Sequence, residues 1–245
     1  MSHARGAMLV LAALTAGCAR PTSGFLDRVY KGPDGVASKY VVFVPHDYSA
    51  NRPPPVILFL HGGGEAGTDG RKQTTVGLGP AVRAREQTFP FVVVFPQAQD
   101  CVPATFATWL PGQPDAERAL AILAAVEQEF HTDPTRVFLT GISVGGFGTW
   151  QMAAADPHRW AAIVPVCGHV PRTKVATLKD VPCWYFVGAD DDVTPVQSAR
   201  DMVAALKEAG GRPRFTEFAG VGHNCWDRAY DTDELYDWLP RQSRE

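Results

Sequence analysis

One serine stands in a glycine-flanked turn whose spacing suits a nucleophile. Ser143 lies in the segment Gly-Ile-Ser-Val-Gly at residues 141–145, after the apolar run Val137–Leu139 and before a helix-compatible stretch that begins at Phe147. A serine in so tight a strand-to-helix turn has strained backbone geometry, and glycines two positions away on either side avoid clashes that larger residues would cause. The turn lifts the hydroxyl out of the sheet and aims the N-terminus of the next helix at developing negative charge. We therefore predict that Ser143 attacks a carbonyl carbon.

A serine hydroxyl is a poor nucleophile until a base removes its proton, so a histidine is expected at the end of a later strand. His223, in Gly-His-Asn at residues 222–224, meets this expectation. His169 is the rival because it also follows a strand, but it precedes the acidic candidates and would invert the order serine, acid, histidine. We predict that His223 is the base.

Three consecutive carboxylates, at residues 190–192, follow the apolar run Trp184–Val187 and could orient the imidazole. Many enzymes with this serine motif carry the acid four residues before a proline, and only Asp191 has that spacing, to Pro195. Asp190 is the alternative, because a sequence does not define the turn of a loop. Asp191 is the predicted partner of His223, and its neighbours are interpreted as helix caps or solvated carboxylates.

The oxyanion of a tetrahedral intermediate needs backbone N–H donors. One is expected from Val144, the residue after the nucleophile, and the other from the loop Leu-His-Gly-Gly-Gly-Glu at residues 60–65, which follows a buried strand. Gly63 is the predicted second donor, because small residues let the backbone approach the substrate. A flexible glycine turn is the simpler interpretation of the same loop.

The elements that must position these residues alternate between strand-like and helix-like patterns. The strand-like runs are 25–30, 39–44, 56–60, 91–95, 137–139, 163–166 and 184–187, and the helical stripes lie in 115–130 and 199–206. The first two runs bracket a Gly-Pro-Asp-Gly turn, which is typical of a hairpin. The later runs are continuously apolar, as parallel strands covered on both faces require. The pattern predicts an α/β fold with a twisted, mostly parallel sheet, entered by an antiparallel hairpin, with ligands beyond the carboxyl ends of its strands.

With the oxyanion loop first along the chain, then the serine turn, the acid loop and the histidine loop, these four motifs resemble the compact esterases of the phospholipase/carboxylesterase and dienelactone-hydrolase group. The resemblance is closest to the exported "predicted peptidase" branch of that group, near feruloyl and acetyl-xylan esterases. The resemblance covers residues 25–240 and implies the α/β-hydrolase fold, a sheet of about eight strands with helices on both faces, and carboxylic-ester hydrolysis without a cofactor or metal. Dienelactone hydrolases use a cysteine nucleophile, so Ser143 departs from their chemistry. The substrates implied are small or polysaccharide-linked esters with acetyl, feruloyl or short-chain acyl groups.

The segment between Val166 and Pro182 is too short for a helical lid, so we expect an open site. Trp226 and Trp109 are predicted to line it, because aromatic faces suit sugar rings and hydroxycinnamoyl groups, although tryptophan is also a common packing residue. A serine peptidase and a non-catalytic hydrolase-fold binding module are the alternatives. No peptide pocket is evident from the sequence, and a binding module would not need the complete set of catalytic residues.

The N-terminus differs from the rest of the chain. Arg5 and an apolar stretch over residues 7–16 predict a signal peptide at 1–18, a tether at 19–24 and a catalytic domain at 25–245. The segment before Cys18 resembles a lipobox, which implies membrane anchoring through a lipidated Cys18 in the cell envelope; an ordinary secretory peptide is the alternative.

The remaining composition sets further expectations. The net charge of −3 with interspersed acids and bases does not favour a nucleic-acid partner, and nothing indicates an oligomeric state. The other cysteines, Cys101, Cys167, Cys183 and Cys225, allow three disulfide pairings in an exported chain. Cys167 with Cys225 is the favoured pairing, because both are expected at the edge of the active site.

Overall fold

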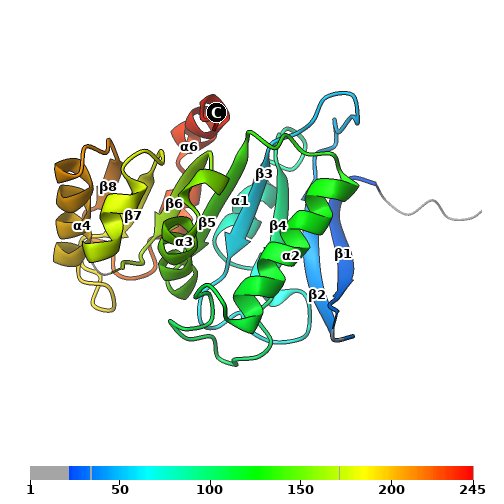
Figure 1. Ribbon diagram of the computed structural model, residues 1–245, viewed down its shortest axis with the longest axis horizontal. Coiled ribbons are helices and arrows are strands. Elements are labelled where there is room, and N and C mark those ends of the chain that lie inside the picture. Colours follow the sequence, from blue (N-terminus) through cyan, green and yellow to red (C-terminus); the bar gives the residue numbers. More distant parts are fainter. Residues whose placement is uncertain (1–21, 34, 171, 245) are drawn as a thin grey trace, which may run out of the picture.

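A single sheet of eight strands organises the molecule, which we describe from a computed structural model of residues 22–33, 35–170 and 172–244 (Figure 1). The strand order is β1-β2-β4-β3-β5-β6-β7-β8. Strand bounds are β1 Gly24–Lys31, β2 Ala37–Val44, β3 Val56–Leu60, β4 Val92–Pro96, β5 Val137–Ile142, β6 Ala162–Val166, β7 Trp184–Gly188 and β8 Arg214–Phe218.

The pairing directions confirm the predicted sheet. β1 and β2 form an antiparallel hairpin, β2 joins β4 antiparallel, and the ladders from β4 through β8 are all parallel. Strands β3, β4, β5, β6 and β7 are buried along their whole length, as their continuous apolar sequences predicted. β8 forms the far edge and stays half-exposed.

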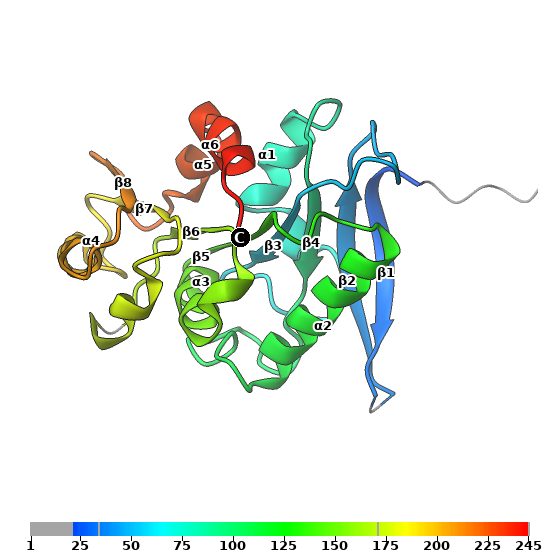
Figure 2. The ribbon, with the colours of Figure 1, turned by 45° about the horizontal axis from the view of Figure 1, so that its top comes forward.

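Helices cover both faces of the sheet. They are α1 Leu78–Ala84, α2 Pro114–Glu129, α3 Val144–Ala155, α4 Val196–Glu208, α5 Trp226–Tyr230 and α6 Asp233–Trp238. Figure 2 shows α1, α5 and α6 on the side of the sheet opposite α2 and α3. The buried residues divide accordingly, since one core contains side chains of α2, α3 and α4 and the other contains those of α1, α5 and α6.

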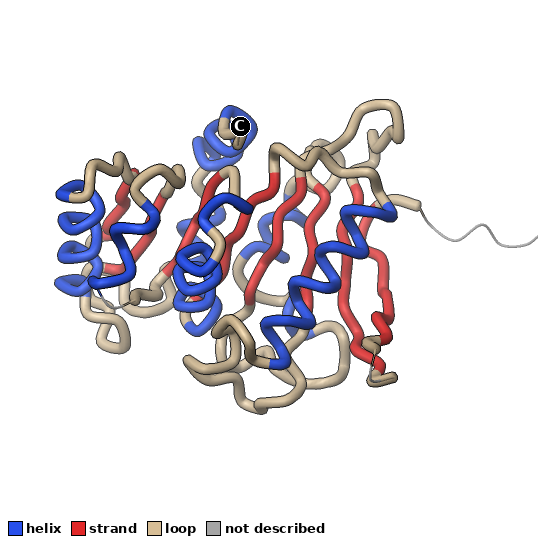
Figure 3. The backbone as a smooth tube through the Cα atoms, viewed as in Figure 1, coloured by secondary structure: helices blue, strands red, loops and turns tan. Residues whose placement is uncertain are grey.

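Long loops gather at the edge of the sheet where β3 and β4 end (Figure 3). The connection from β6 to β7 holds only the 3-10 helix Arg172–Leu178 among its described residues, in line with the expected absence of a helical lid.

The predicted signal peptide and Cys18 lie outside the described residues. Gly24, which was expected to end the tether, is the first residue of β1 and pairs with Val44 of β2. Across the part of the chain that the structure describes, no helix is both long enough and apolar enough to cross a membrane.

Candidate active site

Ser143, Asp191 and His223 meet at the carboxyl edge of the sheet, on the loops after β5, β7 and β8. His223 Nε2 lies 2.8 Å from Ser143 Oγ, and His223 Nδ1 lies 2.9 and 3.0 Å from the two carboxylate oxygens of Asp191. The Asp191 side chain is fully buried and that of His223 is 19% exposed. The three side chains singled out in the sequence thus form one hydrogen-bonded relay from a buried carboxylate to a partly exposed hydroxyl.

The loop after β7 distinguishes the two candidate acids. Asp191 Oδ1 also accepts backbone N–H groups of Val193, at 2.9 Å, and Thr194, at 2.7 Å. These bonds hold the buried carboxylate toward the imidazole. Asp190 is exposed, and the hydrogen bonds and ion pair of His223 go to Asp191 instead. His169, the rival histidine, packs against Phe147 rather than bonding to the serine.

The turn at Ser143 has the strain that its glycine neighbours predicted. Ser143 has φ of 51°, a left-handed conformation that costs a non-glycine residue about 1 kcal/mol or more. A Cβ on Gly145 would lie 2.0 Å from the carbonyl oxygen of Leu60, and one on Gly141 would lie 2.4 Å from the carbonyl oxygen of Gly145. Neither position has room for a methyl group, because both obstacles are backbone atoms.

Replacing Gly145 by alanine should therefore damage the fold itself. We expect Gly145→Ala to lower the midpoint of thermal unfolding by about 10 °C, since backbone overlap costs roughly 3 kcal/mol and each kcal/mol shifts a domain of this size by about 2–4 °C. Gly64→Ala is the matched control, because a Cβ there meets nothing within 4 Å. Equal melting of the two variants, measured by circular dichroism, would show that the turn tolerates a side chain.

The two predicted oxyanion donors, Gly63 and Val144, are neighbours. A Cβ on Gly63 would lie 3.9 Å from Val144 Cγ2. Within the described residues, neither backbone N–H has a hydrogen-bond acceptor, and that of Val144 is the first of helix α3, where intrahelical partners are lacking. The arrangement therefore leaves two N–H groups beside Ser143 that can donate hydrogen bonds to an oxyanion.

His61 fixes the loop that carries Gly63. Its Nδ1 lies 2.7 Å from the Gly62 carbonyl oxygen, and its Nε2 accepts the Ala98 N–H at 2.9 Å. These partners define a neutral ring that donates through Nδ1 and accepts through Nε2. Burial lowers the pKa of His61 to about 4.

The stability of the protein should therefore fall between pH 6.5 and 4. In this range unfolded His61 binds a proton that folded His61 excludes, so acidification favours unfolding, by about 3 kcal/mol for a shift of this size. His61→Gln keeps a donor and an acceptor but does not titrate. We expect the difference in unfolding free energy between wild type and variant to shrink as the pH falls, as measured by urea titration. A difference that is independent of pH would contradict this assignment.

The prediction that Trp109 lines the cleft is wrong. Trp109 is only 1% exposed, so it does not line the cleft. Its indole N–H donates to the His61 carbonyl oxygen at 3.1 Å, and its ring meets the His61 ring edge-on at 5.0 Å. Trp109 is a packing residue that supports the Gly63 loop. Its distance along the chain from that loop hid this role in the sequence.

Trp226 lies beside the relay at the start of α5. Its ring meets the His223 imidazole edge-on, with centroids 5.8 Å apart, and it is partly exposed. The ring also packs against the core on the α1 face. Its contact with substrate stays a prediction.

The predicted disulfide is absent, which is a second correction. Cys167 and Cys225 are free thiols and both are completely buried. Burial first, and then the neighbouring Cys225 thiol, raise the pKa of Cys167. The two side chains meet below the site, as their positions suggested, but they remain unlinked in the core. Cys101 and Cys183 are free as well.

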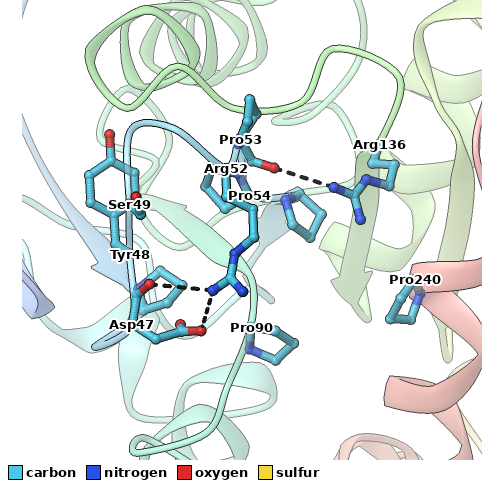
Figure 4. Close-up of a pocket in the computed structure, with 11 residues that line it drawn as sticks. Asp47, Tyr48, Ser49, Arg52, Pro53, Pro54, Pro90, Arg136 and Pro240 are labelled. Carbon is cyan, nitrogen blue, oxygen red and sulfur yellow. Dashed lines mark hydrogen bonds and ion pairs between the residues drawn. The ribbon is translucent and has the colours of Figure 1, made fainter.

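A hollow of about 220 Å³ lies away from the relay, and Figure 4 shows it lined largely by prolines. Its walls include residues that precede β3, β4 and β5, so it lies at the opposite edge of the sheet. Arg52 and Arg136 are engaged there by Asp47 and by the Pro53 carbonyl oxygen.

Among the described residues, no group of three or more histidine, cysteine, aspartate or glutamate side chains could hold a metal ion.

A sheet of this order, with a serine turn after β5 and an acid and a histidine after β7 and β8, defines the α/β-hydrolase class. The chain belongs to the family described as putative esterases, whose model matches residues 37–224.

Relatives and solved structures agree with this assignment. The chain is 25% identical over 212 residues to a bifunctional acetylxylan esterase/xylanase of Neocallimastix patriciarum, covering 86% of this chain and 29% of the relative. It is 24% identical to a probable carboxylesterase of Oryza sativa subsp. japonica, covering 70% of this chain and 82% of the relative.

Among solved structures, a thermostable esterase superposes with a TM-score of 0.80 at 33% identity, covering 90% of this chain and 63% of that one. An S954A mutant of the feruloyl esterase module from Clostridium thermocellum, complexed with sinapinate, has a TM-score of 0.65 at 18% identity, covering 90% of this chain and 88% of that one. The latter likeness concerns the fold alone. The chain thus spans less than a third of the bifunctional relative and under two thirds of the thermostable esterase.

Proposed function

We propose that this protein is a serine carboxylesterase that works through an acyl-enzyme. The observation that carries the proposal is the position of His223, with Nε2 2.8 Å from Ser143 Oγ and Nδ1 2.9 Å from Asp191. The esterase family match and the relatives named for ester hydrolysis support the same activity.

In the first step, Ser143 Oγ bonds to the ester carbonyl carbon while its proton moves to His223 Nε2. Gly63 and Val144 N–H groups stabilise the oxyanion, and Asp191 stabilises the imidazolium. The carbon–oxygen bond to the alcohol then breaks, and the alcohol leaves with the proton from Nε2. Water attacks the acyl group in the second step, gives its proton to Nε2 and releases the acid, after which Oγ recovers its proton.

We propose small or polysaccharide-linked esters with acetyl, feruloyl or short-chain acyl groups as substrates. The open edge of the sheet supports access by a polymer-linked ester, and the acetylxylan esterase named among the relatives supports an acyl group on a carbohydrate. A panel from ethyl acetate through longer acyl chains to methyl ferulate and acetylated xylan ranks these classes by kcat/KM.

A fluorophosphonate probe tests the nucleophile directly. We expect one probe adduct per chain, located at Ser143 by peptide mass spectrometry, with ester hydrolysis falling in proportion to labelling. Labelling at another residue, or complete labelling with activity retained, would contradict the proposal. Cleavage of peptide anilides faster than matched esters would favour the serine peptidase instead, and failure of both labelling and hydrolysis would favour the binding module.

We also propose export with anchoring through a lipidated Cys18. The support is the charged and apolar N-terminal pattern that ends in the lipobox-like segment. Expression of the full chain in a bacterial host, followed by membrane fractionation, tests it: wild type should sediment with membranes and Cys18→Ser should not. Equal distribution of the two would remove the anchor.

A further inference from the structure

Three aromatic rings form a connected surface beside the candidate nucleophile. No sequence motif predicted this surface. Phe106, on the loop after β4, packs on Phe147, with ring centroids 4.4 Å apart and planes tilted by 49°. Phe147 in turn packs on His169, at 4.7 Å and 53°. We call these three side chains the aromatic ledge.

The ledge is continuous with the reacting groups at three points. The Phe147 N–H donates to the Ser143 carbonyl oxygen at 3.0 Å, so this ring lies one helical turn after the nucleophile. The loop of Phe106 is tied to the oxyanion loop, because the Ala104 N–H donates to the Gly63 carbonyl oxygen at 3.0 Å. The negative charge of Asp191 acts on the His169 imidazole and raises its pKa, against the larger lowering effect of burial. The ledge thus runs past Ser143 from the oxyanion loop to the acid loop.

Phe106 remains 56% exposed despite its packing. Within the described part of the chain, five large apolar side chains are exposed, and three of them, Val102, Phe106 and Val193, lie on the loops after β4 and β7 that flank the relay. Single exposed apolar side chains are ordinary, but an exposed aromatic ring that packs beside the serine turn is a candidate ligand contact.

The exposed ring is also held in place. The Thr105 N–H donates to Thr108 Oγ1 at 2.8 Å, and the Trp109 indole, three residues after Phe106, is bonded to His61. A ring fixed before binding loses little conformational freedom when a ligand covers it. Burial lowers the pKa of His169, so this end of the ledge is uncharged near neutral pH and suits an apolar partner.

We infer that the aromatic ledge is a specificity surface that receives an aromatic ring of the ester substrate, on either its acid or its alcohol side. The inference rests on the proposed esterase function and goes beyond it by naming Phe106, Phe147 and His169 as the residues that select for a ring. Flat rings pack against tilted aromatic faces more favourably than saturated rings of the same size.

Two pairs of esters test the ledge and distinguish the sides. Methyl 3-phenylpropanoate against methyl 3-cyclohexylpropanoate reports the acid side, and 2-phenylethyl acetate against 2-cyclohexylethyl acetate reports the alcohol side. Hydrolysis is followed by pH-stat, so no chromophoric ring is introduced. In one pair we expect kcat/KM to favour the phenyl ester by about 3- to 10-fold.

The variants assign this preference to the ledge. Phe106→Leu keeps apolar area without a π-face and should bring the ratio close to one, while Phe106→Tyr should retain it. Val29→Ala changes an equally exposed apolar residue on β1 and should leave every rate unchanged. Suppose that wild type hydrolyses ethyl acetate. Absence of a phenyl preference in both pairs, or a preference that survives Phe106→Leu, would then overturn the inference that the ledge selects for an aromatic ring. Failure of wild type to hydrolyse any ester, ethyl acetate included, would overturn the proposed function and the ledge together.

Discussion

Ser143→Ala should lower kcat/KM for ethyl acetate by about 10⁴-fold or more. The change removes the only atom that bonds to the acyl group, and His223 then has no hydroxyl to deprotonate. Losses of this order are typical when a member of a nucleophilic triad is removed, because the remaining activity comes only from binding and the oxyanion donors.

The same variant should fold as well as wild type. Ser143 is partly exposed and its left-handed backbone is imposed by the turn, so loss of the hydroxyl removes one hydrogen bond to His223 and little packing. Thermal unfolding of Ser143→Ala within about 3 °C of wild type would establish that the loss is chemical. Activity within tenfold of wild type in the variant would rule out Ser143 as the nucleophile.

Asp191→Asn should lower kcat by roughly 10⁴-fold with a smaller change in KM. An amide keeps the shape of the side chain, but it cannot stabilise an imidazolium and can donate to Nδ1, which favours the wrong tautomer of His223. The bonds from Val193 and Thr194 reach Asp191 Oδ1 and hold the side chain in place, so a geometric collapse is not expected.

The adjacent aspartate supplies the matched control. Asp190→Asn makes the same chemical change one residue earlier, on an exposed side chain, whereas the hydrogen bonds of His223 are made to Asp191. We expect its kinetic constants to stay within about twofold of wild type. A larger loss in Asp190→Asn than in Asp191→Asn would exchange the two assignments.

The central strands and the relay were predictable because their signals are local. Five continuous apolar runs mark strands that are buried on both faces, and the residues that follow those runs must meet at one edge of a parallel sheet. For this reason the sequence placed Ser143 and Gly63 at that edge, and the spacing to Pro195 selected Asp191 as the partner of His223.

The remaining elements depend on contacts that a pattern does not reveal. β8, Arg-Phe-Thr-Glu-Phe, is half-exposed at the sheet edge and has no continuous apolar run, so it was not among the predicted strands. Helix α3 begins at Val144 rather than Phe147, because the first turn of the helix is part of the serine turn itself. Short helices α5 and α6 offered too few turns for a periodic stripe.

The tryptophan and ledge residues show the same limit at the site. Trp109 and Phe106 lie three residues apart on one loop, yet the first is buried and the second is 56% exposed. The loop's hydrogen bonds to Gly63 and His61 decide which ring turns inward. The sequence indicates that this loop carries aromatic residues, but not which of their rings faces solvent.

Because β8 lies at the edge of the sheet, we expect the part of the chain that leads to His223 to unfold early. β8 has one neighbour in the sheet, β7, while His223 lies on the loop that follows it. An edge strand with half-exposed side chains separates from its sheet at a lower free-energy cost than a central strand does. Partial denaturation should therefore move His223, the proposed base, away from an otherwise intact sheet, and activity should then be lost before global unfolding.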